Sequence, residues 1–271
     1  AWPGGGIMVR WGGGHEGVDK ARCAAAGIHV ANTPGILESA VAEHALWLLG
    51  SLAKGVVRQH REMAGGQWTG REGIELRGRK LLVVGCGRIG RELARKAALG
   101  FGMVVTGCGR LGLKSLLERE GVSFEDFSAS TGLSDYTNAL QDALPRADAV
   151  VICAAATAAT RHLVSEDFLA QMKPGALLVN VSRGSLVDEK ALFDSLAGGH
   201  LGGAGLDVFE CEPYAPVDRD HDLRGLVNVV LTPHSASHTE ESNDGIARMA
   251  AQTVITALTQ GVEGLGNLVG G

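Results

Sequence analysis

The sequence predicts an α/β protein built on a doubly wound parallel sheet, and three observations predict it. Short aliphatic and β-branched runs alternate with helical patterns over most of the chain. A glycine-rich turn at residues 85–90 directly follows one such run and opens a helix. An arginine, a glutamate and a histidine (Arg183, Glu212 and His234) stand at or just after later runs. Because the carboxyl ends of parallel strands share one edge of a sheet, these side chains can converge there.

Composition narrows the class of protein. The 271 residues suffice for one large domain or two smaller ones with a sizeable core. The net charge is −5 and the basic residues are scattered among acidic ones, which argues against nucleic acid or an anionic membrane as a partner. No uninterrupted apolar run reaches membrane-spanning length. The five cysteines form no C-x-x-C pair, which favours free thiols in a reducing compartment, most simply the cytoplasm.

The first part of the chain predicts two strands, at residues 7–11 and 28–32, around a short helix at 18–26. The turn at residues 33–35 is a natural crossing between domains. The longest helical pattern covers residues 39–64, with Val41, Ala45, Leu48 and Leu52 at helical spacing. Its wide apolar face fits either a partner subunit or the core of its own domain.

The rest of the chain alternates between strands and helices. Residues 81–86 and 103–106 are expected strands around a helix at 88–99. Residues 109–138 are polar and rich in Gly and Ser, so an irregular excursion with one helical piece at 113–120 is expected. The later strands are expected at 149–154, 176–181, 203–208 and 229–231, and the later helices at 165–172, 188–196 and 239–259.

The glycine-rich turn predicts a dinucleotide-binding Rossmann unit. Its three glycines match G-x-G-x-x-G between a strand and a helix. Gly85 permits the tight turn, Gly87 lets the backbone approach a pyrophosphate, and Gly90 lets the helix pack closely on the strand. Free N–H groups at the helix start would bind the phosphates. The alternative is a glycine-rich turn without a ligand, which the strand–turn–helix context disfavours.

The end of the next strand favours NADP(H) over NAD(H). An acidic residue that binds the ribose of NAD is expected there, about 20 residues further on. Gly109 occupies that place and Arg110 follows it. Without a carboxylate there is no repulsion against a 2′-phosphate, and Arg110 could pair with that phosphate. Alternatively, Arg110 is a solvated loop residue.

The arginine, glutamate and histidine suit a small anionic carbonyl compound. Arg183 could bind a carboxylate bidentately, although a structural salt bridge would use it equally well. A carboxylate bonded to an imidazole fixes its tautomer and favours its protonated form, as Glu212 could do for His234. Reduction of a ketone needs such a proton donor. Taken alone, a histidine at position 234 is more often an ordinary surface or core residue. No histidine spacing predicts a metal site.

Together these residues resemble the D-isomer-specific 2-hydroxyacid dehydrogenases, the group that includes glyoxylate/hydroxypyruvate reductases and phosphoglycerate dehydrogenase. The resemblance covers nearly the whole chain. It is carried by RWGGG from residue 10, NTPG from 32, VAEH from 41, MKPGA from 172, GLDVF from 205 and TPH from 232. It implies interconversion of a 2-oxo acid and its D-2-hydroxy acid by hydride transfer with a nicotinamide cofactor and no metal.

The resemblance also implies roles for individual residues. Arg183 would bind the substrate carboxylate, with the backbone of Gly13 and Gly14 on its other side. His234 would be the acid/base and Glu212 its partner. Cofactor contacts are expected from the glycine turn and from residues at strand ends, namely Gly85, Gly87, Arg88, Ile89, Gly90, Gly109, Arg110, Thr157, Val181, Ser182, Arg183, Asp207, His234 and Ala236.

The domain organisation expected from the resemblance is a Rossmann cofactor domain at residues 36–233 and a smaller, split, flavodoxin-like substrate domain at 1–35 and 234–271. The site would lie in the cleft between them. A homodimer through the helix at 39–64 is implied as well.

Three departures from the family are visible. The first strands of the substrate domain are missing, so this domain is expected to be incomplete. A His-x-Pro-x-Thr segment is replaced by CAAAT, which keeps only Thr157, and the excursion at 109–138 is longer than usual. Two alternatives therefore stay open: a nucleotide-sensing protein like the co-repressors of this fold, and an inactive fragment. Organelle targeting stays open too, since a targeting peptide would lie in the missing stretch.

Overall fold

A computed structural model describes residues 5–269, which form two compact units. The larger unit is Val41–Ala236, and the smaller combines the described residues of Ala1–Ala40 and of Ser237–Gly271. The predicted domain limits of 1–35, 36–233 and 234–271 stay a prediction. Their outermost residues, 1–4 and 270–271, lie outside the described part of the chain.

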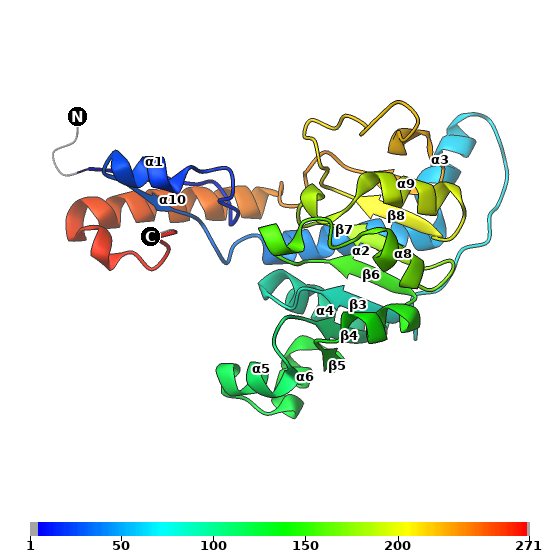
Figure 1. Ribbon diagram of the computed structural model, residues 1–271, viewed down its shortest axis with the longest axis horizontal. Helices are drawn as coiled ribbons and strands as arrows, with labels where there is room; N and C mark the ends of the chain where they lie inside the picture. Colours follow the sequence, from blue (N-terminus) through cyan, green and yellow to red (C-terminus); the bar gives the residue numbers. More distant parts are fainter. Residues whose placement is uncertain (1–4, 270–271) are drawn as a thin grey trace. The chain divides into compact units, whose positions relative to one another are not determined.

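The larger unit contains a seven-stranded parallel sheet with the order β5-β4-β3-β6-β7-β8-β9 (Figure 1). Its strands are β3 (Lys80–Val84), β4 (Val104–Cys108), β5 (Leu133–Thr137), β6 (Ala149–Ile152), β7 (Leu177–Asn180), β8 (Gly203–Leu206) and β9 (Val229–Leu231). Every neighbouring pair is parallel. The order runs outward in opposite directions from β3 and β6, so the predicted doubly wound sheet is confirmed. Ligands of such sheets bind outside the carboxyl ends at this switch point.

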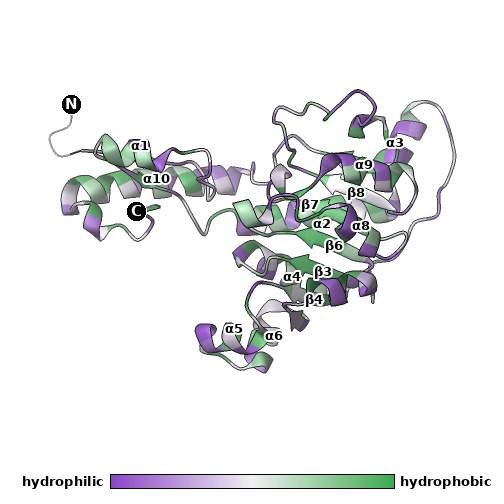
Figure 2. Cartoon of the chain, viewed as in Figure 1, coloured by the Kyte–Doolittle hydropathy of each residue, from purple (hydrophilic) through white to green (hydrophobic). Residues whose placement is uncertain are grey.

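Helices cover the sheet because its strands are apolar on both faces. The helices of this unit are α2 (Glu38–Lys54, which begins in the smaller unit), α3 (Val56–Ala64), α4 (Arg88–Phe101), α5 (Leu113–Glu120), α6 (Phe124–Thr131), α7 (Leu140–Ala143), α8 (Glu166–Gln171) and α9 (Glu189–Ala197). All residues of β6, β7 and β8 are buried, and the central strands are hydrophobic in Figure 2. One face, with Ile152 and Leu178, shares a core with Phe168 of α8 and Leu192 of α9.

The opposite face of β8 receives α2 because β8 lacks side chains there. A Cβ at Gly205 would lie 2.9 Å from Leu48 Cβ, and one at Gly203 would lie 3.1 Å from Leu52 Cδ2. The two glycines therefore let the α2 backbone approach the sheet closely. This packing fixes the position of the first turns of α2, which reach the candidate site.

The prediction of one continuous helix over residues 39–64 is wrong, although both parts of it are helical. The structure divides it into α2 and α3, which meet at an angle of 62°. Gly55 separates them with a φ of 62°, a left-handed conformation that glycine adopts without steric cost. Apolar periodicity continues across Gly55, so periodicity alone did not predict the bend.

The irregular excursion predicted over residues 109–138 is wrong except for its helical piece at 113–120, which is confirmed as α5. The structure places α5, α6 and β5 there, and β5 is the edge strand beside β4. The Ser and Gly residues that suggested a loop are helix ends. Ser123 accepts a hydrogen bond from Asp126 N at the start of α6, while Gly121 and Gly132 end α5 and α6 with positive φ.

The smaller unit is built on two parallel strands, β1 (Gly6–Val9) and β2 (Ile28–Ala31), with α1 (Lys20–Ala25) between them in the chain. The long helix α10 (Glu240–Gln260) belongs to the same unit, and Thr239 caps its first turn. The chain then returns to β2, where Val269 N donates to Val30 O at 2.8 Å. Asn267 also donates to Asn32 O, at 2.6 Å.

Within the described residues, no single helix has the length and hydropathy to cross a membrane, and α2 with α3 meets that test only as a bent pair.

Candidate active site

The glycine turn between β3 and α4 is shaped as a cradle. Gly85 has a φ of 102°, and a Cβ there would lie 2.4 Å from Ala154 N. A Cβ at Gly90 would lie 2.1 Å from Gly85 O, so neither position admits another residue. A Cβ at Gly87, by contrast, would meet nothing within 4 Å. The open space at Gly87 leaves room for a ligand at the start of α4, where the first N–H groups of a helix have no partner within the helix, as pyrophosphate binding requires.

Polar contacts hold this turn in place. Arg91 Nε donates to Cys86 O at 3.1 Å, and its guanidinium pairs with both carboxylate oxygens of Glu120 at 3.0 Å. Burial raises the pKa of the Cys86 thiol to about 12, so the thiol stays neutral beside the turn. Arg88 is exposed in the first turn of α4, where the resemblance places it against the pyrophosphate, and Ile89 is half-buried.

The end of β4 carries the two residues predicted to select the cofactor. Gly109 N donates to Thr137 O at 3.1 Å, which continues the pairing of β4 with β5. Arg110 follows and is exposed. Both residues thus stand at the carboxyl edge of the sheet. Their contact with a ribose stays a prediction.

The ends of β6 and β7 are joined by hydrogen bonds. Ser182 Oγ donates to Ala154 O at 2.5 Å, while buried Val181 and exposed Thr157 flank this contact in sequence. The fully buried Asn180 bridges the turn, because its Nδ2 donates to Arg183 O and its Oδ1 accepts from Ser182 N. The backbone that carries Arg183 is therefore fixed.

Gly184 brings the arginine turn against the loop that carries the glutamate. A Cβ at Gly184 would lie 1.8 Å from Phe209 C and 1.9 Å from Phe209 O. Only glycine permits this approach of two backbones. The half-buried Arg183, whose Nη1 donates to Ser182 O at 2.7 Å, is thereby placed at the strand end next to β8.

Glu212 and His234, 22 residues apart in the chain, form a direct pair. His234 Nδ1 lies 2.7 Å from Glu212 Oε2. The other carboxylate oxygen accepts from Phe209 N at 3.0 Å, which fixes the orientation of the carboxylate. The side chains are 47% and 36% exposed, so the imidazole remains accessible. With Nδ1 donating to Glu212, Nε2 is the nitrogen left for another partner.

Buried Asp207 organises the turn on which His234 lies. Its Oδ1 accepts from Thr232 Oγ1 at 2.6 Å and from Ser235 N at 2.9 Å, and its Oδ2 accepts from Ala236 N at 2.9 Å. Its backbone oxygen accepts from His234 N at 2.8 Å. These bonds hold His234 at a φ of 51°, a left-handed conformation that is rare outside glycine.

His44 of α2 completes this cluster. Its Nε2 lies 2.9 Å from Thr232 Oγ1 and 3.5 Å from Asp207 Oδ1. Burial alone would raise the pKa of Asp207, but hydrogen bonds from His44, Thr232 and the backbone outweigh it and lower this pKa. Sequence reasoning missed His44 because its partners are 163 and 188 residues away. The predicted contacts of Asp207 and Ala236 with a nicotinamide stay predictions.

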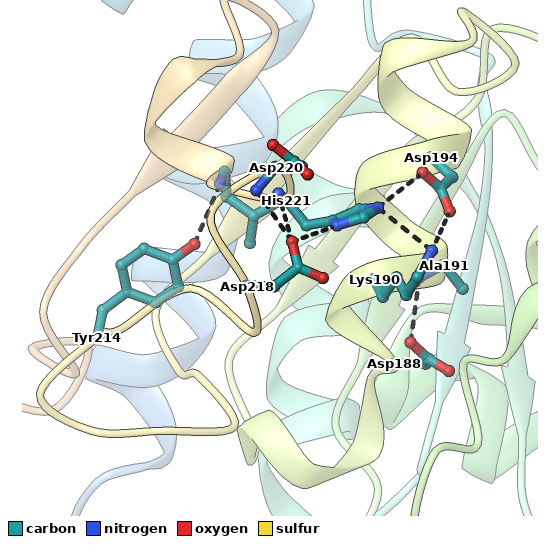
Figure 3. A network of polar contacts seen from close by, with 9 residues as sticks. Asp188, Lys190, Ala191, Asp194, Tyr214, Asp218, Asp220 and His221 are labelled. Carbon is teal, nitrogen blue, oxygen red and sulfur yellow. Dashed lines mark hydrogen bonds and ion pairs between the residues drawn. The ribbon is translucent and has the colours of Figure 1, made fainter.

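The loop after Glu212 is pinned to α9 by His221 (Figure 3). His221 Nδ1 lies 2.6 Å from Asp218 Oδ1, and its Nε2 lies 3.3 Å from Asp194 Oδ1 of α9. At the start of the loop, Tyr214 Oη accepts from Leu223 N at 3.1 Å. A pocket of about 750 Å³ opens beside the histidine and glutamate, lined by Phe209, Tyr214, Leu231, Pro233, Arg61 and Arg224 among others.

A buried carboxylic acid, Glu189 in the first turn of α9, is bonded to the segment that leads into Glu212. Its Oε1 accepts from Glu210 N at 2.6 Å, and its own N donates to Glu210 Oε1 at 3.3 Å. Burial raises the pKa of Glu189, and the charges of Glu210 and Glu212 add to the rise. The local sequence offered no signal for this role, because a glutamate in a first helical turn is usually a solvated residue.

Gly13 and Gly14, the predicted carboxylate site, belong to the smaller unit. Gly13 O accepts from Asn32 Nδ2 at 2.8 Å, and Gly12 N donates to Thr33 Oγ1 at 2.9 Å. The turn at Gly12 and Gly13 is therefore held by the side chains of Asn32 and Thr33, which follow β2. The contact of Gly13 and Gly14 with a substrate stays a prediction. Within residues 5–269, no group of three or more His, Cys, Asp or Glu side chains is arranged to hold a metal ion.

Comparison with known proteins assigns this arrangement to one family. The family model described as D-isomer specific 2-hydroxyacid dehydrogenase, NAD binding domain, matches residues 46–236. Glyoxylate reductase of Korarchaeum cryptofilum is 38% identical over 255 residues, which are 92% of this chain and 72% of that protein. Glyoxylate/hydroxypyruvate reductase B of Erwinia tasmaniensis is 36% identical over 255 residues, with shares of 92% and 74%.

Solved structures agree with this match. The D-lactate dehydrogenase of Aquifex aeolicus, complexed with NAD and lactic acid, has a TM-score of 0.83 and 27% identity. The similarity covers 98% of this chain and 80% of that one.

Proposed function

The chain belongs to the D-isomer-specific 2-hydroxyacid dehydrogenases, and on that premise we propose that it reduces a small 2-oxo acid to its D-2-hydroxy acid with His234 as the acid/base. It is an NAD(P)-dependent enzyme of this family. Glyoxylate and hydroxypyruvate are the first substrates to consider, because the relatives named above are glyoxylate and hydroxypyruvate reductases. The single observation that carries the proposal is the contact of 2.7 Å between His234 and Glu212.

That contact supports proton transfer by His234. With Glu212 accepting from Nδ1, the imidazole presents Nε2 to the substrate oxygen. In the reducing direction, the protonated ring gives its proton to the oxygen at C2, and Glu212 offsets the positive charge of the ring. The bound nicotinamide supplies the hydride. In the oxidising direction, His234 takes the hydroxyl proton back.

Arg183 is proposed to bind the substrate carboxylate. Its planar guanidinium can hold a carboxylate through two parallel hydrogen bonds. The turn that carries it is fixed by Asn180 and by Gly184, so the guanidinium begins from a defined backbone position. We propose that the backbone of Gly13 and Gly14 contacts the other side of the same carboxylate, as the resemblance implies.

The cofactor is proposed to be NADP(H) in preference to NAD(H). The glycine cradle at the start of α4 fits the pyrophosphate of either cofactor. Gly109 contributes no carboxylate to repel a 2′-phosphate, and the exposed Arg110 follows at once. These features support the phosphorylated cofactor.

A homodimer through α2 is proposed as well. Trp47 of α2 is 72% exposed, and Leu99 and Phe101 of α4 are 73% and 41% exposed. They line one apolar groove of about 430 Å³ with Leu46. Large apolar side chains grouped on a surface are typical of subunit interfaces. A second copy of the chain is the occupant that the resemblance implies.

Initial rates with NADH and NADPH over a panel of 2-oxo acids test the proposal. The panel contains glyoxylate, hydroxypyruvate, pyruvate and 2-oxoglutarate, and chiral analysis identifies the product of those that form a stereocentre. We expect turnover of at least one of them, a D-product and a higher kcat/KM with NADPH. Cofactor binding without turnover of any 2-oxo acid would contradict the proposed reaction, and equal use of both cofactors would contradict the preference.

A further inference from the structure

Tyr136 lies where β5 runs beside the cofactor-selecting end of β4. It pairs in register with Gly107, and the next residue of β5, Thr137, accepts a hydrogen bond from Gly109 N at 3.1 Å. Its side chain is buried, with 7% exposed. The tyrosine therefore packs against the strand end that carries Arg110.

Two glycines of β4 and its turn make room for this side chain. A Cβ at Gly109 would lie 2.3 Å from Tyr136 Oη and 3.3 Å from Cζ. A Cβ at Gly107 would lie 3.1 Å from the Tyr136 ring. Carbon atoms do not approach an oxygen to 2.3 Å, so any side chain at position 109 must displace the phenol. The position of the Tyr136 phenol therefore requires glycine at position 109.

We propose that Tyr136 determines cofactor specificity by occupying the place from which a carboxylate at position 109 would bind the ribose, and by offering its hydroxyl to the 2′-phosphate. This inference rests on the proposed preference for NADP(H). It assigns the preference to two linked features, the exclusion of an acid at position 109 and the added hydroxyl donor of Tyr136, which act together with Arg110.

The surroundings of the phenol suit an anion. Among residues 5–269 its hydroxyl has no hydrogen-bond partner, so one donor remains for a ligand. Burial raises the pKa of Tyr136, which keeps the hydroxyl protonated. The positive charges of Arg91 and Arg119 act on the ring as well, although both arginines are paired with Glu120. A phosphate oxygen accepts hydrogen bonds from a neutral phenol, and the carboxylate of an acidic residue would compete for the same place.

Binding of adenosine fragments separates this inference from the proposed preference. The probes are 2′,5′-ADP and 5′-AMP, measured by calorimetry with the full chain. For Tyr136→Phe we expect about a tenfold loss of affinity for 2′,5′-ADP and little change for 5′-AMP, as for one lost hydrogen bond to a charged group. Tyr214→Phe makes the same chemical change at the other tyrosine and should leave the ratio of the two affinities unaltered.

A second experiment tests whether substitutions at positions 109 and 136 depend on each other. Gly109→Asp alone should lower kcat/KM with both NADH and NADPH, because its Cβ collides with the phenol. Adding Tyr136→Phe should restore NADH use by tenfold or more over Gly109→Asp, and leave NADPH use low. If NADH use is the same in the single and double variants, and Tyr136→Phe leaves the ratio of fragment affinities unaltered, Tyr136 has no such role. If the unaltered chain binds 5′-AMP as tightly as 2′,5′-ADP, the NADP(H) preference itself is wrong.

Discussion

At the scale of single residues, the histidine turn shows how backbone contacts place a reactive group. His234 has a left-handed backbone, and Asp207 compensates through bonds to the two following amides and to the Thr232 hydroxyl. His44 adds a further contact from α2. Placing one imidazole beside Glu212 thus requires residues from three separate parts of the sequence.

The first prediction concerns Gly184, where another close backbone approach is required. Gly184→Ala puts a Cβ within 2 Å of the Phe209 carbonyl group, so the turns after β7 and β8 must separate. We expect a loss of about 1–3 kcal/mol in the free energy of unfolding and a lower kcat/KM, because the Arg183 and Glu212 turns move apart. Denaturant titration and steady-state kinetics measure both. Gly225→Ala, where a Cβ meets nothing within 4 Å, should leave stability unchanged.

The second prediction concerns the pH dependence of stability at Glu189. Burial raises its pKa in the folded state, so its contribution is fully present below the unfolded pKa and is lost as pH rises through the folded pKa. Glu189→Gln keeps the acceptor for Glu210 N and removes this loss. The Tm of the variant relative to the unaltered chain should therefore rise from pH 4 to pH 8. A constant difference would argue against burial of a charged group, and the exposed Glu75→Gln serves as the control.

At the scale of elements, the helix limits that the sequence pattern mispredicted lie at glycines. The strands β6, β7 and β8 were predictable because their buried apolar runs leave few alternatives, whereas the edge strand β5 was not predicted. The bend at Gly55 and the limits of α6 were not, since a glycine in a helical pattern can be interior, a break or a cap. The distinction depends on tertiary packing, which the local sequence does not contain.

The third prediction concerns the packing of α2 on β8. Gly205→Ala places a Cβ 2.9 Å from Leu48 Cβ, so α2 must move away from the sheet. We expect a destabilisation of about 1–3 kcal/mol from overpacking. Gly50→Ala lies within α2 itself, where a Cβ meets nothing within 4 Å, and should be neutral or stabilising by about 0.4–1 kcal/mol. The denaturant midpoints of the two variants show whether stability depends on the contact between Gly205 and Leu48 or falls when any glycine in this region is replaced.

At the scale of the whole molecule, the fourth prediction tests the proposed dimer. Trp47→Glu puts a charge into the apolar groove formed with Leu99 and Phe101, where a desolvated carboxylate is unfavourable. We expect a dimer for the unaltered chain and a monomer for the variant in sedimentation equilibrium at micromolar concentration. Ile255→Glu, at another exposed apolar residue, should remain dimeric. A monomeric unaltered chain would refute the interface.

The candidate site was predictable in part. The glycine turn is local, so its strand–turn–helix pattern suffices to identify it. The pairing of Glu212 with His234 is not local. Their positions at strand ends made the pairing possible, and the resemblance to a family implied it before the structure. His44, Glu189 and Tyr136 were missed because each acts through partners brought together by the fold, and no spacing in the sequence links them.

The central claim is that His234, held by Glu212, transfers the proton, and His234→Gln tests it most directly. The measurement is kcat with the best 2-oxo acid of the panel, together with the Kd of the cofactor by fluorescence titration. We predict a kcat lower by roughly 10²–10⁴-fold with the cofactor Kd within about twofold of the unaltered chain, as for loss of a general acid. A kcat within about tenfold of the unaltered chain would contradict the account, because loss of a general acid costs more than that.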